Sequence, residues 1–538
     1  MELVRRQELI RASATDAQDN PGGCGLYAAA KARPKVRAAA WQLRYDGQPF
    51  MLRVIRESAV HLHGDDRVST WEGLQAALKE RIAPWDLHPG VRIYVEHAVE
   101  HYLDAHDELA ARFGEARFAR FDPTAGGDGR ELTAWAPLYQ YQDGTREVRR
   151  MRLRSARSSA GPEDDRWSAV AAHAAAGQAM RLPASLIRVV EVGLFDGSTE
   201  ITFEGTPQQA YERYAAHVRP VIQLFLHSVD ARPGRNCHRC KLAGCCASLV
   251  DETRVLGQES AGTHTRSVSA SDLELYSKCA ARWYLERVCH LPKDDDGIPS
   301  TASERGRAVH RWLADAHARN TPCIASDTGS YDAPETFTGS LGPDEYEQVR
   351  DFLAAHVGSC PLDGVQGLSL ETPVYGYDAA ADVIIASQPD LVYVDSAGRV
   401  VIRETKTAVE MPEDANDAFD RFFAVAWLIN IAKFAKGAFG ESADLPRVEL
   451  EVITPERSQV FTWQPQDEGV ARMAHSDVRQ HVSAWHHDAA WPASPGPQCS
   501  WCPVRRWCPD AADPDAAPAG QPYLEDEPCA GMPPGSPE

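Results

Sequence analysis

The cysteines of this chain follow one spacing pattern that occurs twice. The motif Cys-x2-Cys-x5-Cys is formed first by Cys237, Cys240 and Cys246 and then by Cys499, Cys502 and Cys508. Each copy has one more cysteine far upstream, Cys24 at 213 residues (237 − 24) and Cys279 at 220 residues (499 − 279). Four thiolates can hold one metal centre, which would join the two ends of a domain. The nearly equal spacing indicates a tandem duplication.

The cysteine count also bears on the compartment. The sequence has no charged segment followed by an apolar run at its start and no apolar stretch of about 18 residues, so we expect a cytoplasmic protein with no membrane partner. In a reducing compartment, the 13 cysteines are better suited to metals than to disulfides. Cys245, beside Cys246, leaves the choice of ligand in the first copy open. The other four have no partner pattern and are expected to be incidental: Cys289, Cys323, Cys360 and Cys529.

Length and composition divide the chain into four parts. At 538 residues it has room for two or three domains. We expect a first domain over residues 1–250, a polar linker over 251–268, a second domain over 269–510 and a disordered acidic Pro/Ala-rich tail over 511–538.

Hydrophobic spacing in the second domain is typical of an α/β fold. It predicts helices over residues 271–287, 304–318 and 422–439, and strands over 370–375, 391–394, 400–405 and 448–463. The first domain repeats this order more faintly. Residues 58–63 match 307–312, which aligns His61 with His310, and residues 136–153 match 389–404.

Four residues of the second domain form a candidate catalytic set. Glu404 and Lys406 alternate on a strand and therefore project to the same face, and a hairpin would bring Asp390 beside them. Two carboxylates at one place repel unless a hard divalent cation lies between them, and Mg²⁺ or Mn²⁺ suits oxygen ligands. His310 could add an imidazole ligand, while the lysine could orient or deprotonate a water that attacks a phosphodiester.

Each of these signals has an ordinary structural explanation when taken alone. Glu-x-Lys on a strand is usually a solvated pair, Pro389-Asp390 is a frequent turn opener, and a lone histidine is more often a core or surface residue. The specificity lies in their occurrence in order between Cys279 and Cys499.

The second domain resembles a RecB-type nuclease of the PD-(D/E)XK superfamily. More narrowly, it is similar to the branch with an iron–sulfur centre that includes CRISPR-associated RecB-like exonucleases and the nuclease domain of AddB. The residues that carry the resemblance are Ser271, Tyr276 and Cys279, Gly306-x3-His310, Pro389-Asp390, Glu404-x-Lys406 and the loop with Cys499, Cys502 and Cys508.

The resemblance implies a mixed sheet flanked by helices, metal-dependent DNA cleavage and a [4Fe–4S] cluster on Cys279, Cys499, Cys502 and Cys508. It assigns Asp390, Glu404 and His310 as metal ligands and Lys406 as the catalytic lysine. The family's Gln-x3-Tyr motif on the following helix is replaced here by Phe423-x3-Trp427, which puts the substrate contacts in doubt.

The nature of the two cysteine centres stays open from spacing alone. Four thiolates suit Zn²⁺ as well as iron–sulfur, although structural zinc sites usually take their ligands in two close pairs. In the first domain, Cys24, Cys237, Cys240 and Cys246 could hold a second cluster, zinc or no metal.

The first domain is expected to be an inactive copy. The match over residues 136–153 places Leu153 and Ser155 at the positions of Glu404 and Lys406, with Pro137 near that of Asp390, so no metal site remains. Residues 145–161 instead carry six arginines, which form either a solvated basic face or a surface for phosphates: Arg146, Arg149, Arg150, Arg152, Arg154 and Arg157.

Two classes of function follow. The first is a metal-dependent DNA nuclease that acts on single-stranded ends in repair, recombination or defence. Because no Gly-x4-Gly-Lys-Ser/Thr motif is present, a helicase in trans is the expected partner. The alternative is a non-catalytic iron–sulfur DNA-binding or scaffold subunit of a helicase–nuclease complex, and a two-zinc regulator is a weaker third. A net charge of −21 argues against a general nucleic-acid coat protein.

Overall fold

The computed structural model describes most of the chain, and the statements below concern the part that it describes. The described residues are 10–19, 23–33, 35–36, 51–62, 71–127, 130–157, 161, 164–234, 236–262, 267–293, 301–329, 343–365, 367–439 and 445–511. Cys529 and the expected tail beyond residue 511 lie outside them.

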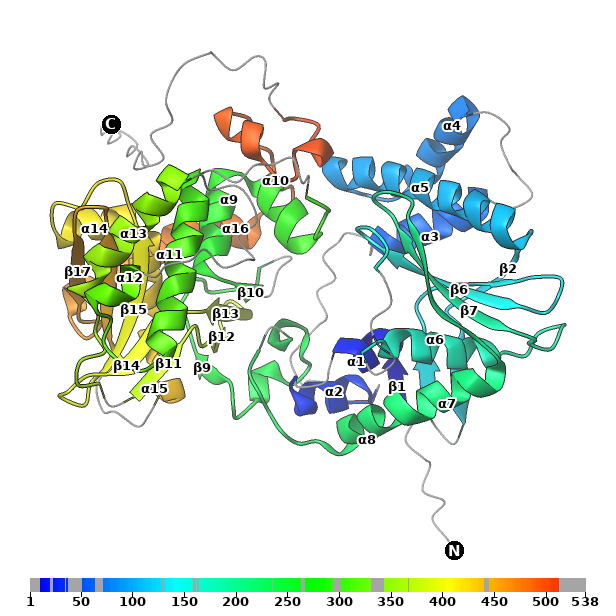
Figure 1. Ribbon diagram of the computed structural model, residues 1–538, viewed down its shortest axis with the longest axis horizontal. Helices are drawn as coiled ribbons and strands as arrows, with labels where there is room; N and C mark the ends of the chain where they lie inside the picture. Colours follow the sequence, from blue (N-terminus) through cyan, green and yellow to red (C-terminus); the bar gives the residue numbers. More distant parts are fainter. Residues whose placement is uncertain are drawn as a thin grey trace, which may run out of the picture.

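Two five-stranded sheets share one topology. Their strand orders are β2-β5-β6-β7-β8 and β11-β14-β15-β16-β17 (Figure 1). In each sheet the third and fourth strands are parallel and all other neighbours are antiparallel. The strands are β2 (Arg117–Phe121), β5 (Pro137–Gln140), β6 (Arg146–Arg152), β7 (Ile187–Gly193), β8 (Thr199–Gly205), β11 (Gly367–Leu370), β14 (Leu391–Val394), β15 (Val400–Thr407), β16 (Arg447–Ile453) and β17 (Ser458–Trp463).

Helices cover both faces of each sheet in corresponding order. In the first half, α6 (Arg166–Ala176) follows the third strand and packs against β6 and β7, while α5 (Pro89–Phe113) packs on the other face. In the second half, α15 (Phe423–Phe439) packs against β15 and β16. Opposite it lie α11 (Thr301–Ala318), which contacts β15, and α13 (Pro343–Val357), which contacts β16.

The remaining elements surround these two layers. Two smaller sheets have the orders β1-β4-β3 and β10-β13-β12-β9. Their strands are β1 (Ile10–Ser13), β3 (Thr124–Gly127), β4 (Arg130–Thr133), β9 (Val250–Glu252), β10 (Ser267–Val268), β12 (Val374–Asp378) and β13 (Val383–Ser387). The other helices are α1 (Ala14–Asp19), α2 (Gly25–Lys31), α3 (Met51–Leu62), α4 (Trp71–Ile82), α7 (Pro207–His217), α8 (Arg219–His227), α9 (Ala270–Lys278), α10 (Ala280–Trp283), α12 (Ala325–Gly329), α14 (Ala415–Arg421) and α16 (Glu468–His487). None of the described helices is long and apolar enough to cross a membrane.

The segment expected to be a linker contributes strands at both its ends. β9 pairs with β12, and β10 pairs with β13. Between them, the fully buried Asp378 accepts hydrogen bonds from the backbone N–H groups of Arg254 (3.0 Å) and Leu256 (2.8 Å). These contacts fix the connection between the halves to the second half.

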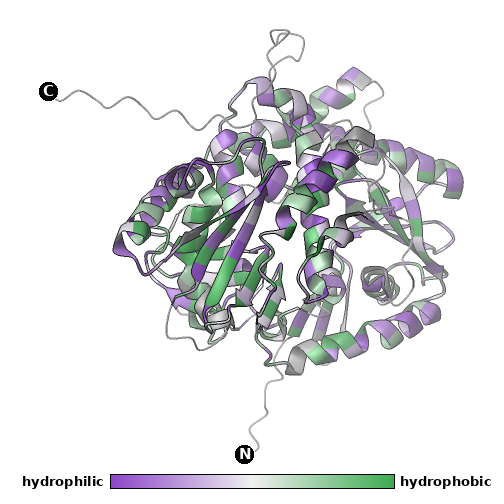
Figure 2. Ribbon diagram, turned by 60° about the vertical axis from the view of Figure 1, so that its left-hand side comes forward, coloured by the Kyte–Doolittle hydropathy of each residue, from purple (hydrophilic) through white to green (hydrophobic). Residues whose placement is uncertain are grey.

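The two halves share one hydrophobic core, and the cysteine loop of each half packs against the other half. Apolar side chains from both halves form one buried cluster, and Figure 2 shows hydrophobic residues concentrated on the strands. The loop with Cys240 packs on Tyr377 and Ile384 of the second half. In the other direction, Trp507 in the second cysteine loop contacts Tyr94 of α5, with ring centroids 5.0 Å apart. Each cysteine loop therefore lies against the other half of the molecule (Figure 1).

Candidate active site and cysteine centres

The hairpin of β14 and β15 brings the expected catalytic residues together. Asp390 precedes β14, and its carboxylate accepts a hydrogen bond of 2.8 Å from the backbone N–H of Thr405 on β15. Glu404 and Lys406 flank Thr405 on the opposite face, and Lys406 Nζ lies 2.8 Å from Glu404 Oε1. The side chains are partly exposed, at 26% for Asp390, 15% for Glu404 and 34% for Lys406.

The fourth residue comes from a different element. Helix α11 packs against β15, and this contact places His310 Nδ1 at 3.3 Å from Asp390 Oδ1. The hairpin and the helix therefore bring His310, Asp390, Glu404 and Lys406 to one place.

The charges of this site are strongly coupled. Burial raises the pKa of Glu404, the nearby charge of Asp390 raises it further, and Lys406 opposes both effects. Burial would also raise the pKa of Asp390, but His310, the Thr405 N–H and Lys406 together lower it. The charge of Glu404 raises the pKa of Lys406, so this lysine stays protonated. Two carboxylates in one site, where the charge of Asp390 raises the pKa of Glu404, suit a divalent cation, as expected for Mg²⁺ or Mn²⁺.

A cavity of about 310 Å³ opens beside Glu404 and Lys406. Two of its lining residues were not expected as site residues from the sequence. Glu274 of α9 adds a third carboxylate, and its charge helps to raise the pKa of Lys406. Trp427 of α15 lies where the resemblance expects the tyrosine of Gln-x3-Tyr, and its ring lines the same cavity. Only the fold brings α9 to this strand end, so Glu274 has no local sequence signal, whereas the resemblance to the family already drew attention to the position of Trp427.

The second cysteine quartet gathers around one small cavity. Cys279, Cys499, Cys502 and Cys508 all line it. Cys279 interrupts the helix expected over residues 271–287, ending α9 and capping α10, where its Sγ accepts a bond of 3.4 Å from Arg282 N. Cys499 lies in the 3-10 turn η4 (Pro497–Trp501), and Cys502 directly follows it. Cys508 directly follows a second 3-10 turn, η5 (Arg505–Trp507).

The first quartet repeats this construction. Cys24, Cys237, Cys240 and Cys246 line one cavity. Cys24 caps α2, and its Sγ accepts a bond of 3.4 Å from Tyr27 N, as Cys279 does from Arg282. The loop again holds two 3-10 turns, η1 (Cys237–Arg239) and η2 (Ala243–Cys245).

The thiol environment of both quartets suits a metal centre. Burial and the neighbouring cysteines raise the pKa of Cys240 and that of Cys502 to about 11. A bound metal would relieve this crowding by stabilising the thiolates. Both sets of donors therefore fit a four-thiolate centre.

The strand register corrects the expected equivalence between the halves. The turns after β5 and β14 have equal length, since Tyr141 N bonds Thr145 O and Asp395 N bonds Arg399 O, both at 2.9 Å. Counting from these turns places Arg150 at the position of Glu404 and Arg152 at that of Lys406, instead of Leu153 and Ser155. The sequence match had assumed turns of unequal length, and it therefore aligned Glu404 with Leu153, three residues beyond Arg150.

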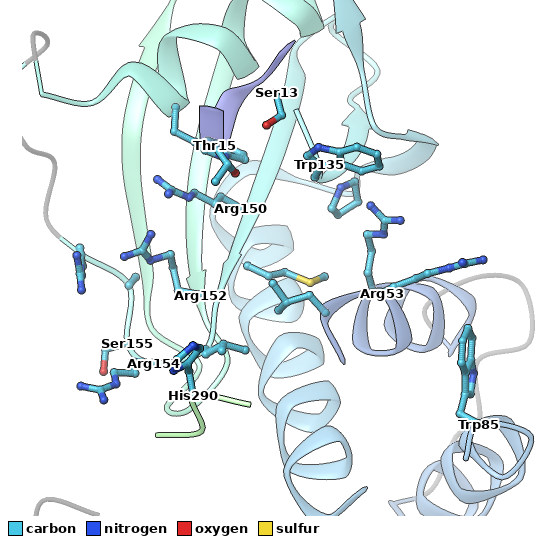
Figure 3. Close-up of a pocket in the computed structure, with 18 of the residues that line it drawn as sticks. Ser13, Thr15, Arg53, Trp85, Trp135, Arg150, Arg152, Arg154, Ser155 and His290 are labelled. Atoms are coloured by element: carbon cyan, nitrogen blue, oxygen red, sulfur yellow. The ribbon is translucent and has the colours of Figure 1, made fainter. Parts of the chain in front are cut away.

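In the same frame Ala136, next to Pro137, takes the position of Asp390. His61 of α3 is exposed and does not line the cavity beside Arg150. That cavity, of about 1510 Å³, is lined by cationic and aromatic side chains (Figure 3). They are Lys31, Arg53, Arg56, Trp85, Trp135, Arg150, Arg152, Arg154, Arg157, Trp167, Arg239 and His290.

Cys323 and Cys360 were expected to be incidental cysteines without partners, but the fold places them close to each other. Together with His317 and His356 they form a group whose ligand atoms all lie within 4.8 Å of one another. The two pairs are separated by the segment between α12 and α13, so their proximity depends on how α11 and α13 pack. Their local spacing, His-x5-Cys and His-x3-Cys, was the available signal.

Comparisons with known proteins assign the second half. Residues 267–509 match the family model of the PD-(D/E)XK nuclease superfamily, and no curated protein matches the chain. The second half is therefore a domain of this nuclease superfamily, with the mixed α/β architecture described above.

Two solved structures are weakly similar. The crystal structure of SSO0001 is 12% identical, with 46% of this chain and 88% of that chain covered and a TM-score of 0.23. The crystal structure of a "Putative exonuclease" from Eubacterium rectale is 11% identical, with 40% and 79% covered and a TM-score of 0.27. Likenesses this weak support no inference about activity.

Proposed function

We propose that this protein is a metal-dependent DNA nuclease with one active site, which lies in the second half. The observation that carries the proposal is the convergence of His310, Asp390, Glu404 and Lys406 beside an open cavity. His310, Asp390 and Glu404 would hold the cation, and a bound Mg²⁺ or Mn²⁺ would offset the negative charge that develops on a phosphodiester.

The side chains of the chain itself define the remaining roles. Lys406, whose ammonium group donates to Glu404 Oε1, can donate a hydrogen bond to the attacking water or to a phosphate oxygen. The Thr405 N–H holds the Asp390 carboxylate in place. The cavity lined by Glu274 and Trp427 lies beside Glu404 and Lys406 and is the place for the nucleotide next to the scissile bond.

The test is degradation of end-labelled single-stranded DNA with Mn²⁺ or Mg²⁺. Glu404→Ala should lower the rate by about 100-fold or more, the scale on which catalytic groups contribute. Glu413→Ala removes an exposed carboxylate from the same half and should leave the rate unchanged. Equal rates for the wild type and Glu404→Ala would place the activity elsewhere.

For the first half, we propose DNA binding without cleavage. Arg150 and Arg152 stand where the second half has Glu404 and Lys406. The first half therefore has guanidinium groups at the place where the second half would bind a metal ion. Glu191 is the ion-pair partner of both, at 2.9 Å from Arg150 and 3.6 Å from Arg152. The surrounding arginines leave the cavity positive, and Trp135, 60% exposed, offers a face on which a base can stack (Figure 3).

This role predicts a salt-dependent change in affinity. In the uncleaving Glu404→Ala background, Arg53→Ala and Arg154→Ala should each weaken binding of labelled single-stranded DNA. Each should also make the dependence of log K on log salt shallower by about 1 for each lost phosphate contact. Arg117→Ala, an exposed arginine on β2 outside the cavity, is the matched control. Equal affinities for all three variants, measured by fluorescence anisotropy, would contradict the binding role.

For the cysteine quartets, we propose [4Fe–4S] clusters. Each quartet lines one cavity. Among the described residues, the group whose ligand atoms lie close enough together for a single ion is that of His317, Cys323, His356 and Cys360, and it includes neither quartet. A cluster of four irons and four sulfides is wider than one zinc ion, which favours the cluster. Iron and acid-labile sulfide analysis of the anaerobically purified protein tests this.

The cellular role is part of the same proposal. A nuclease without a motor motif fits work beside a helicase in trans, in the cytoplasm, during repair, recombination or defence against foreign DNA. The second candidate, a non-catalytic scaffold subunit, is favoured by the replacement of Gln-x3-Tyr by Phe423 and Trp427. It gains if neither the wild type nor Glu404→Ala degrades DNA while both bind it.

A further inference from the structure

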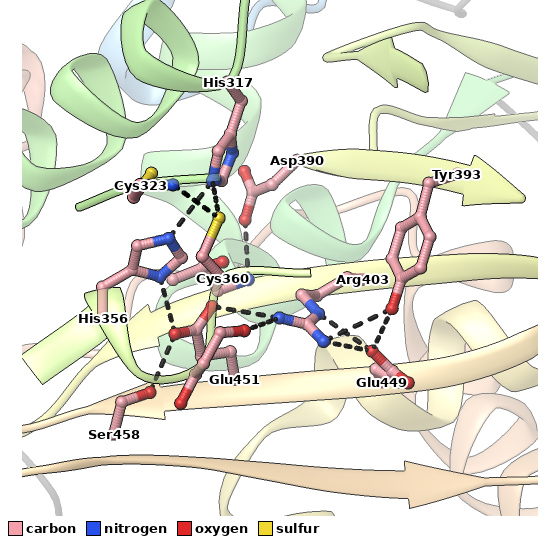
Figure 4. A network of polar contacts seen from close by, with 12 residues as sticks. His317, Cys323, His356, Cys360, Asp390, Tyr393, Arg403, Glu449, Glu451 and Ser458 are labelled. Atoms are coloured by element: carbon pink, nitrogen blue, oxygen red, sulfur yellow. Dashed lines mark hydrogen bonds and ion pairs between the residues drawn. The ribbon is translucent and has the colours of Figure 1, made fainter. Parts of the chain in front are cut away.

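The second half contains a buried group of histidines and cysteines that none of the roles above uses. His317 lies near the end of α11, and Cys323 lies in the loop before α12. His356 lies in the last turn of α13, and Cys360 lies just after this helix. His317, Cys323 and His356 are at most 6% exposed. Figure 4 shows the four residues gathered at one place beside the strands.

We propose that His317, Cys323, His356 and Cys360 bind one structural zinc ion. Their ligand atoms all lie within 4.8 Å of one another. His317 Nε2 is 3.2 Å from His356 Nε2, and Cys360 Sγ is 3.8 Å from His317 Nε2. A tetrahedron built with the usual Zn–N and Zn–S bonds has edges of about 3.3 Å between nitrogens and about 3.6 Å between nitrogen and sulfur. The separations of His317 Nε2 from His356 Nε2 and from Cys360 Sγ are close to these edges.

The surroundings of His356 fix the nitrogen that faces the group. Its Nδ1 lies 2.7 Å from Oε1 of Glu451, a fully buried carboxylate that also accepts a bond of 2.8 Å from Ser458. The Nδ1–H of His356 therefore points to Glu451, which leaves the lone pair of Nε2 directed at His317 and the cysteines. A carboxylate behind a ligating imidazole is the usual support of a zinc ligand.

The donor set identifies zinc and a structural role. Two imidazoles and two thiolates supply all four positions, which leaves none for a substrate. The ligands form two close pairs, His317-x5-Cys323 and His356-x3-Cys360, as in structural zinc sites. The backbone N–H of Cys323 donates to Cys360 Sγ at 3.3 Å, a bond that supports a thiolate.

The site also connects to the proposed nuclease centre, and this consequence rests on the proposed function. His310 lies seven residues before His317 on α11, which places both on one face of the helix. On the sheet, Glu451 pairs in register with Thr405, the residue between Glu404 and Lys406. Zinc would therefore join the helix that carries His310 to the strand beside Glu404, through His356 and Glu451.

The test is the metal content and ligand set of the full chain. We expect one zinc per chain by elemental analysis, with zinc-edge X-ray absorption showing two nitrogen and two sulfur ligands. His317→Ala and Cys360→Ser should lose this zinc, whereas Cys289→Ser, which removes a cysteine outside all three ligand sets, should keep it. This result does not depend on whether the protein cleaves DNA.

Three outcomes would overturn the proposal. Zinc with four sulfur ligands would place it in a cysteine quartet. Absence of zinc from wild-type protein produced and purified with added zinc would exclude the site without any variant, so a variant that fails to fold does not decide the matter. A Cys323–Cys360 disulfide in non-reducing peptide mapping of the protein purified in reductant would remove the thiolates from the site.

Discussion

Two arginines occupy equivalent positions in the two halves at the level of single residues. In the frame set by the equal turns, Arg149 corresponds to Arg403 and Tyr139 to Tyr393. Each guanidinium lies over its tyrosine ring, at 4.1 Å for Arg149 and 5.7 Å for Arg403. Both arginines are buried on the sheet face opposite the catalytic strand positions. The two halves therefore agree on this face of the sheet and differ on the other, where Arg150 and Arg152 stand at the positions of Glu404 and Lys406.

Arg403 is expected to be a major stabilising residue. It lies 2.6 Å from Glu449 and 3.6 Å from Glu451, both buried, so Arg403→Met would remove an arginine from two buried carboxylates, of which Glu449 keeps Arg447 at 2.9 Å (Figure 4). We predict a loss of about 3–5 kcal/mol of unfolding free energy in urea titrations. Arg399→Met removes an arginine that is 51% exposed and pairs with Asp395, and should cost at most about 1 kcal/mol. Equal losses for both variants would show that the buried pair is not stabilising.

At the scale of elements, the sequence predicts the hairpin of β14 and β15 well because its signal is local. The strand expected over residues 370–375 instead covers the end of β11 and the start of β12, and the one expected over 448–463 is two strands, β16 and β17. The strand over residues 391–394 is β14 without change, and β15 extends the one over 400–405 by two residues. Both have alternating or continuous β-branched residues beside a turn in which Gly398 adopts a φ of 77°. The helix over 304–318 is α11, which begins three residues earlier.

The features that the sequence does not predict depend on contacts between distant segments. Helix α13 and strand β13 had no prediction, and the segment over 271–287 splits at Cys279, whose side chain caps a new helix. The equivalence of Arg150 with Glu404 needed the strand register, since these two positions differ in residue type and the sequence match had allowed turns of unequal length. The four-residue nuclease set was predictable because its motifs lie in chain order, whereas the His/Cys group needs α11 and α13 to pack together.

At the scale of the whole molecule, the contact between α5 and the second cysteine loop makes stability depend on pH. His97 donates from Nε2 to Phe195 O at 2.8 Å, and its Nδ1 lies 3.5 Å from the guanidinium of Arg506. Burial, helped by His101 and Arg506, lowers the pKa of His97 from 6.5 to about 4 in the folded protein. The folded state therefore prefers the neutral ring, and this preference is fully present above pH 6.5.

It follows that the contribution of His97 is lost as the pH falls from about 6.5 to about 4, where the unfolded state takes up a proton and the folded state does not. His97→Gln keeps a donor for Phe195 O but cannot be protonated, so its melting temperature should fall less on acidification than that of the wild type. His475→Gln, a histidine of α16 outside this contact, should retain the wild-type dependence. If the melting temperature fell equally with pH in His97→Gln and in the wild type, the contact between the halves would not depend on the neutral imidazole ring. A smaller fall of the melting temperature in His97→Gln would show that the imidazole of His97 on α5 links the stability of the first half to the second cysteine loop.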